Sequence, residues 1–277
     1  MIKIRNVHIS RGGSPILKNI SLTIRPGEVV AVVGANGAGK STLLQAIAGA
    51  LLPTQGLISL NGKALADWPA TQLARVRGIL SQKIALSFAF PVIEVVKLGR
   101  HPYSQLLSTQ ENEAIAWHCL QQVGMEEFAY RNMHTLSGGE QQRVHFARVL
   151  AQIYQPHSEE TSYILLDEPT SSLDLYQQHQ LLQMAKNLST QRRVGIFVIL
   201  HDLNLAAQYA DHVLLLKKGK TISQGPPEEV FTQAHIYQGF NVRTEVMKPP
   251  THDQVFIKIL AKPGLNTPNN AITINPH

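Results

Sequence analysis

The stretch GANGAGKST, which runs from Gly34 to Thr42, contains the pattern G-x-x-x-x-G-K-[ST]. It follows the short apolar run Glu28–Val33, which is typical of a strand buried on both faces, and it leads into Lys40–Ala48, which has the spacing of a helix. A glycine-rich loop between a strand and a helix lets backbone N–H groups surround phosphate oxygens. These residues therefore predict a nucleotide-binding loop in an α/β fold.

Every residue of this loop is a candidate for contact with the nucleotide. The Lys40 ammonium can reach the β- and γ-phosphates, and the Ser41 hydroxyl can ligate Mg²⁺. The predicted cofactor-binding set is Gly34, Ala35, Asn36, Gly37, Ala38, Gly39, Lys40, Ser41 and Thr42. A purely structural glycine turn is the alternative, and the strand–loop–helix context disfavours it.

A second motif, YILLDEP at Tyr163–Pro169, ends an apolar strand with two adjacent acids. Ligands of α/β sheets bind at the carboxyl ends of strands, which is where this pattern places both carboxylates. Successive side chains of an extended chain point in different directions. Asp167 can therefore serve a metal, while Glu168 can face an attacking water. A solvated strand end would explain an isolated acid pair, but we favour the metal and water roles beside a phosphate loop.

Three further polar features gain meaning from the loop. Gln82 ends a short strand, GILSQ, and His201 follows the strand VGIFVIL, where it could touch a γ-phosphate. A lone glutamine or histidine is otherwise most often a surface or core residue. The segment SSLD, Ser171–Asp174, is predicted to cap a helix, and Asp174 also counts among the nucleotide-binding candidates.

Composition limits the class of protein. The 277 residues fit one large domain or two small ones, and a 44% hydrophobic and 16% charged chain is typical of a globular protein. A single cysteine, Cys119, predicts no disulfide framework and fits a reducing compartment. No apolar run reaches membrane-spanning length and no secretory signal is present, so we expect a soluble chain. The formal charge of +6 is dispersed and decides nothing by itself.

The hydrophobic period changes twice along the chain. Strand patterns come first, a helical stretch follows at about 83–160, and short apolar strands then return between helices. We predict a unit at 1–245, in which the helical subdomain is inserted into an α/β core, and a C-terminal extension at 246–277. The expected strands are Ile2–Ile9, Ile16–Ile24, Leu57–Leu60, Tyr163–Leu166, Val194–Leu200, Val213–Leu216 and Val255–Leu260. The expected helices are Pro91–Leu98, Gln110–Val123, Ser137–Ile153, Leu173–Leu188 and Leu203–Tyr209.

A second turn that feeds into a helix, LSGGEQQR at Leu136–Arg143, also suits a phosphate. Together with the glycine loop, Gln82, YILLDEP, SSLD and His201, it resembles the ATP-binding subunits of ABC transporters in order and spacing. The resemblance covers nearly the whole chain. It implies a P-loop NTPase fold with a RecA-like core, an N-terminal antiparallel β subdomain and the inserted helical subdomain.

The resemblance also implies ligands and catalytic roles. ATP and Mg²⁺ would be the cofactors, with Ser41, Gln82 and Asp167 at the metal. Glu168 would act as the catalytic base, and His201 would hold the γ-phosphate.

The same resemblance implies a homodimer. The Leu136 turn is far along a separate subdomain, so it would serve the ATP of a second copy. Ser137 and the amides of Gly138 and Gly139 would close on the partner's γ-phosphate, and Glu140 also counts among the nucleotide-binding candidates.

One position departs from the family pattern. The family often has an aromatic residue in the first strand region to stack on adenine, and this chain has Arg11 there, in ISRGG. A guanidinium can stack on a purine, so Arg11 is the expected substitute. His8 is a second candidate, and adenine held loosely is the remaining alternative.

Several stretches resemble one branch of the importers. Phe88–Tyr103 and His201–Gly225 are similar to the branch that serves iron-siderophore, haem and cobalamin permeases. The long connection at Ala151–Tyr163, SSLDLYQQHQ and KPPTHDQVFI are similar to the haem-import members. Ferric siderophore and cobalamin remain the alternative cargoes.

This branch implies the partners and the location. We expect two copies of an integral-membrane permease, an indirect role for a periplasmic substrate-binding protein, and a peripheral position on the cytoplasmic face of the bacterial inner membrane. A non-transport ATPase acting on nucleic acid is the alternative of another class. The sequence offers no aromatic-basic patch for it, so no nucleic-acid partner is expected.

Overall fold

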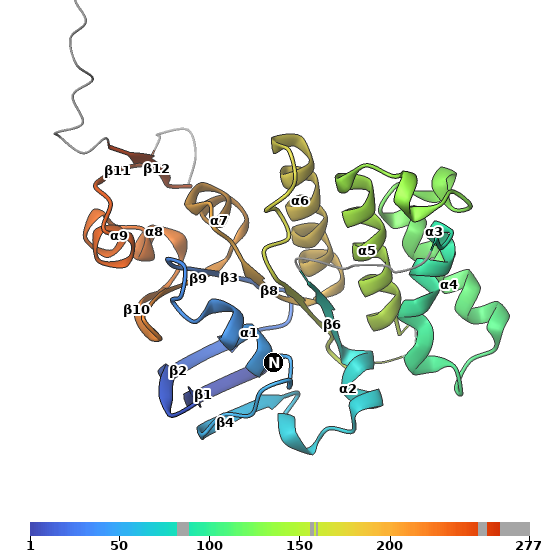
Figure 1. Cartoon of the computed structure of the whole chain (residues 1–277), viewed down its shortest axis with the longest axis horizontal. Coiled ribbons are helices and arrows are strands. Elements are labelled where there is room, and N and C mark those ends of the chain that lie inside the picture. Colours follow the sequence, from blue (N-terminus) through green and yellow to red (C-terminus); the bar gives the residue numbers. More distant parts are fainter. Residues whose placement is uncertain (82–88, 156–157, 159, 249–253, 261–277) are drawn as a thin grey trace, which may run out of the picture.

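The computed structural model describes residues 1–81, 89–155, 158, 160–248 and 254–260. Its centre is a six-stranded sheet in the order β10-β9-β3-β8-β7-β6 (Figure 1). The strands are β3 Val29–Val33, β6 Arg77–Leu80, β7 Tyr163–Leu166, β8 Gly195–Ile199, β9 His212–Lys217 and β10 Lys220–Gly225. All neighbours pair in parallel except β9 and β10. Strands β3, β7 and β8 are buried at every position, as a sheet covered on both faces requires.

A second, antiparallel sheet has the order β2-β1-β4-β5 and lies beside α1 in Figure 1. Its strands are β1 Ile2–Arg11, β2 Ser14–Ile24, β4 Gln55–Leu60 and β5 Lys63–Ala64, and α1 spans Lys40–Ile47. One face of this sheet, α1 and the neighbouring face of the central sheet share one apolar core. The glycine loop therefore lies where the two sheets meet.

The helical region projects to one side of the central sheet (Figure 1). It contains α3 Val92–Lys97, the 3₁₀ segment η2 Leu98–Tyr103, α4 Thr109–Gln122, the 3₁₀ turns η3 Glu126–Phe128 and η4 Met133–Thr135, and α5 Gly138–Ile153. The turn η1 Leu65–Asp67 and α2 Ala70–Val76 precede it. Helices α3, α4 and α5 pack their apolar faces together in a core that continues under the central sheet.

The remainder of the chain returns to the sheet. The helices are α6 Leu175–Arg192, α7 Leu203–Tyr209, α8 Pro227–Val230 and α9 Gln233–Phe240. Strands β11 Thr244–Met247 and β12 Phe256–Ile259 form a separate hairpin, which is attached to α7 because the Asn204 amide bonds both backbone groups of Ile257. Strand β11 crosses the position at which we expected the C-terminal extension to begin.

The predicted fold class is confirmed, with corrections at several elements. The helix expected at Leu173–Leu188 begins at Leu175 and ends at Arg192, because the Asp174 side chain caps its first turn and Arg193 leaves it with φ 54°. The sequence pattern did not predict α2, α8, α9, β10 and β11. These elements are short, and several are held mainly by neighbours that are distant in sequence.

Candidate functional site

Three neighbouring parallel strands bring the predicted motifs to one edge of the central sheet. The glycine loop follows β3, His201 follows β8 and the acid pair follows β7. Because these strands are parallel and adjacent, their carboxyl ends meet at the same edge. Gln82 lies outside the described residues, two positions beyond the end of β6.

The glycine loop is held in its conformation from both sides. Gly37 and Gly39 have φ of 76° and 105°, values that L side chains rarely adopt. A Cβ on Gly39 would also lie 2.6 Å from Leu17 Cδ2. The Gly219 N–H donates to the carbonyl of Ala38 at 2.9 Å, so the turn between β9 and β10 fastens the loop. The loop is therefore preformed by its neighbours.

Lys40 is buried and folds back over the loop. Its Nζ donates to the carbonyls of Gly34 at 2.7 Å and Ala35 at 3.3 Å. Burial lowers the pKa of Lys40, and the nearby carboxylates of Glu168 and Asp167 partly oppose this. The ammonium thus lies within the loop that would surround the phosphates.

A hollow of about 340 Å³ opens above this loop. Glu168 and Ile16 line it together with the loop residues Asn36, Gly37, Ala38, Gly39, Lys40, Ser41 and Thr42. Ile16 belongs to β2 and was not among the residues predicted for the site. In the sequence, Ile16 is one apolar residue of an ordinary strand pattern, which does not indicate contact with a ligand. It reaches the nucleotide loop only because the two sheets meet there.

The two acids after β7 have different surroundings. The Asp167 N–H donates to the carbonyl of Leu80 at 2.9 Å, which ties this position to β6. Burial raises the pKa of Asp167, Glu168 raises it further, and Lys40 opposes both. Glu168 has φ 48°, and its Oε1 lies 2.6 Å from Nε2 of His201. The predicted base and the predicted γ-phosphate residue are thus direct partners.

The oxygen atoms in this region suit Mg²⁺. Ser41 and Glu168 both line the hollow, and Asp167 directly precedes Glu168 in the chain. Hydroxyl and carboxylate oxygens together with phosphate oxygens are the usual ligands of this ion. The residues present therefore fit the predicted metal.

The second turn forms the beginning of α5. The Ser137 hydroxyl donates to Glu140 Oε2 at 2.8 Å and accepts from the Glu140 N–H at 3.4 Å, and the Ser137 N–H donates to the same carboxylate. These hydrogen bonds lower the pKa of Glu140. Residues 136–143 all lie in the described part of the chain, and none of them lines the hollow above the glycine loop. Ser137 and Gly138 are exposed, while Gly139 packs against Gln177.

The structure also shows where Asp174, Arg11 and His8 lie. Asp174 Oδ1 accepts from the Gln177 N–H at 2.9 Å, which confirms that SSLD caps a helix. Arg11 is exposed at the end of β1, and His8 is half-buried in the same strand. Neither Arg11 nor His8 is among the residues that line the hollow. Their roles at adenine remain predictions.

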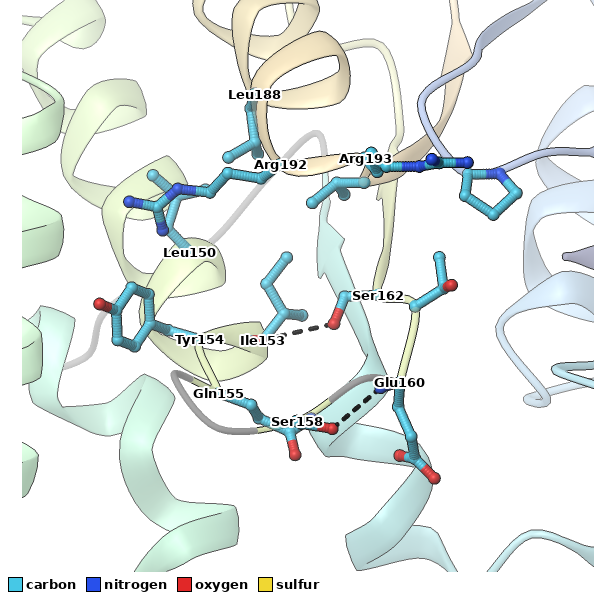
Figure 2. Close-up of a pocket in the computed structure, with 13 residues that line it drawn as sticks. Leu150, Ile153, Tyr154, Gln155, Ser158, Glu160, Ser162, Leu188, Arg192 and Arg193 are labelled. Atoms are coloured by element: carbon cyan, nitrogen blue, oxygen red, sulfur yellow. Dashed lines mark hydrogen bonds between the residues drawn. The ribbon is translucent and has the colours of Figure 1, made fainter.

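A larger hollow of about 610 Å³, drawn in Figure 2, is lined by none of the motif residues that the structure describes. Its lining includes Leu150, Tyr154, Ser162 and Arg192, at the end of α5 and beside the beginnings of β7 and β8. The motifs gather instead at the carboxyl ends of the strands. This hollow is therefore separate from the candidate nucleotide site.

Comparison with known proteins agrees with this geometry. Residues 17–171 match the model of the ABC transporter family, and the chain belongs to this family as its ATP-binding and ATP-hydrolysing subunit. Among solved structures, cbiO1 of Clostridium perfringens, part of an ABC transporter complex, matches with a TM-score of 0.74 and 29% identity, covering 87% of this chain and 94% of that one. A dimeric bacterial ABC transporter cassette matches with a TM-score of 0.69 and 30% identity, covering 82% and 99%.

Within the family, the chain is similar to proteins named hemin import ATP-binding protein HmuV. The protein from Gloeobacter violaceus is 48% identical over 90% of this chain and 90% of its own length. The proteins from Bordetella pertussis and Shewanella denitrificans are 43% and 44% identical, covering 90% and 86% of this chain and 95% and 92% of their own lengths. Among the described residues, none of the helices is long and apolar enough to cross a membrane.

Proposed function

We propose that this chain powers the import of haem by hydrolysing ATP on the cytoplasmic face of a bacterial inner membrane. The observation that carries the proposal is its identity of 43–48% with relatives named hemin import ATP-binding proteins. These matches span 86–90% of the chain. The nucleotide-site motifs gathered at one edge of the central sheet support the ATPase role.

ATP binds above the glycine loop in this proposal. Lys40 and the loop N–H groups neutralise the phosphate charge, which is the main way proteins catalyse phosphoryl transfer. Ser41 and Asp167, with Gln82, hold Mg²⁺, which supplies further neutralisation of the phosphate oxygens. The 2.6 Å contact between Glu168 and His201 supports a joint role for them: Glu168 orients the water, and His201 orients Glu168 and contacts the γ-phosphate.

Two copies of the chain share each ATP. The exposed Ser137 and Gly138 at the beginning of α5 support this arrangement, since this turn lies outside the hollow above its own loop. A helix that begins with free N–H groups attracts phosphate. Ser137 and the Gly138 and Gly139 amides then contact the γ-phosphate bound to the second copy, and Glu140 completes this nucleotide site by holding the Ser137 side chain.

Two permease subunits carry the cargo through the membrane, and a periplasmic protein delivers it. ATP binding and hydrolysis move the helical region relative to the central sheet. The helical region therefore has two positions, and its contact with the permease transmits the nucleotide state. Cargo selectivity belongs to those partners. The ATPase itself has no need to touch haem.

Reconstitution tests this function. The chain would be assembled in vesicles with the permease and the binding protein from neighbouring reading frames, and ATP-dependent uptake of hemin, a ferric siderophore and cobalamin would be compared. Uptake of hemin alone is the expected result. Uptake of either other cargo in preference to hemin would overturn the assignment. A Lys40→Ala variant is the control for ATP dependence.

A further inference from the structure

The C-terminal end of α5 is fastened by side chains from η2. The carbonyls of residues 151–154 each accept a hydrogen bond from a side chain outside the helix, and three of the four bonds come from η2. Arg100 Nη1 donates to Ala151 at 2.5 Å and to Tyr154 at 2.9 Å. The Tyr103 hydroxyl donates to Gln152 at 3.0 Å. Ser162 donates to Ile153 at 3.4 Å, a contact drawn in Figure 2.

Arg100 is the centre of this attachment. Arg100 is only 3% exposed. Its Nε donates to Asn112 Oδ1 at 3.0 Å, and its guanidinium lies 3.7 Å from the centre of the Tyr103 ring. A cation is favourable at a helix C-terminus, where unpaired carbonyls gather. Burying one is costly unless several partners receive it. A planar guanidinium that serves α4, α5 and η2 at once cannot be replaced by a lysine.

The other end of the same helix bears Ser137. Helix α5 has 16 residues, so it is about 24 Å long at 1.5 Å per residue. A tilt of about 5° at one end of a rod of that length moves the other end by about 2 Å. Misplacement of a substrate-contacting group by about 1 Å can lower a rate about 100-fold.

We propose that Arg100 is a positioning residue for ATP hydrolysis, acting through α5 on the Ser137 turn that serves the second copy's ATP. This inference rests on the proposed shared site. Loss of Arg100 leaves the glycine loop of its own copy intact, so ATP binding persists while turnover falls. We therefore expect kcat to fall while the KM for ATP stays unchanged.

The test uses a double-mutant cycle in the full-length chain. We expect Arg100→Ala and Arg100→Lys to lower kcat about tenfold, with the KM and Kd for ATP unchanged within twofold. Ser137→Ala should lower kcat about 100-fold. Combining Arg100→Lys with Ser137→Ala should be no worse than Ser137→Ala alone, since both changes act through one turn. Tyr103→Phe, which removes one hydroxyl, is a milder probe if Arg100→Ala fails to fold.

Arg192→Lys is the matched control. Arg192 and Tyr154 are both drawn in Figure 2, and the Arg192 guanidinium lies 5.2 Å from the centre of the Tyr154 ring at the same end of α5. Arg192 is exposed, however, and its Nη2 contacts the His118 ring. The kcat of Arg192→Lys should stay within twofold of that of the unchanged protein. Three results would each overturn the inference: losses of kcat that multiply when Arg100→Lys and Ser137→Ala are combined, a loss of ATP affinity that accompanies the loss of kcat, or an unchanged kcat in Arg100→Lys. An unchanged kcat in Ser137→Ala would instead overturn the shared site of the proposed function.

Discussion

The imidazole Nε2 of His201 lies 2.6 Å from Oε1 of Glu168, although 33 positions separate the two residues along the chain. The contact exists because β7 and β8 are parallel neighbours whose carboxyl ends lie side by side. Glu168 also has φ 48°, a backbone value that non-glycine residues seldom adopt. A strained position at the end of a strand, held by a histidine and facing the nucleotide hollow, is typical of a reacting group.

Replacing Glu168 with Gln should separate binding from hydrolysis. The amide keeps the size of the side chain and can still accept a hydrogen bond from His201, but it cannot accept a proton from water. We expect the Kd for ATP to change less than threefold and kcat to fall at least about 100-fold. Equilibrium binding and steady-state phosphate release measure the two quantities, and a turnover rate equal to that of the unchanged protein would contradict the role of base.

Gly219→Ala should loosen the nucleotide loop. Gly219 has φ 75°, its N–H bonds Ala38 of the loop, and a Cβ there would lie 1.9 Å from the carbonyl oxygen of Ile16. Gly62 has φ 86° and open space around it, so Gly62→Ala is the matched control. The free energy of unfolding should fall about 1–3 kcal/mol further in Gly219→Ala than in Gly62→Ala. Urea denaturation measures the difference, and equal losses would exclude the steric account.

His145 should make stability depend on pH. It is 5% exposed, its Nδ1 has no hydrogen-bond partner within the described part of the chain, and burial together with Arg148 lowers its pKa to about 4. The folded chain therefore binds fewer protons than the unfolded chain between about pH 6.5 and 4, so stability falls as the pH decreases through that window. This residue should remove about 2 kcal/mol between pH 7.5 and 5.

The His145 contribution can be isolated with His145→Asn. The difference between the two proteins in free energy of unfolding, measured in urea at pH 7.5 and pH 5, should change by about 2 kcal/mol in favour of the variant at pH 5. A difference that stays constant across this range would show that the histidine accepts a proton in the folded chain as readily as in the unfolded chain.

Asp174 can be tested for two roles by two substitutions. Its carboxylate caps α6 through the Gln177 N–H, and asparagine can cap a helix equally well. Asp174→Ala should lower the free energy of unfolding by about 1 kcal/mol, whereas Asp174→Asn should leave it nearly unchanged. ATPase measurements on Asp174→Asn then report any nucleotide role alone, because the cap is preserved. Full activity in that variant would limit Asp174 to capping.

Consecutive residues alone determined the local parts of this protein. The strand, glycine loop and helix at Glu28–Ala48 were predictable because glycine conformations, helix starts and hydrophobic periods depend on neighbours in the chain. The acids after β7 and the Asp174 cap were predictable for the same reason. The order of the motifs was sufficient to recognise the family.

Tertiary structure alone decided how these parts meet. The 2.6 Å contact of Glu168 with His201, the entry of Ile16 into the hollow and the attachment of Arg100 to the end of α5 all join distant segments. The sheet order β10-β9-β3-β8-β7-β6 differs from the order along the chain, so adjacency cannot be derived from sequence separation. Local preferences specify elements, whereas burial of their apolar faces selects which elements become neighbours.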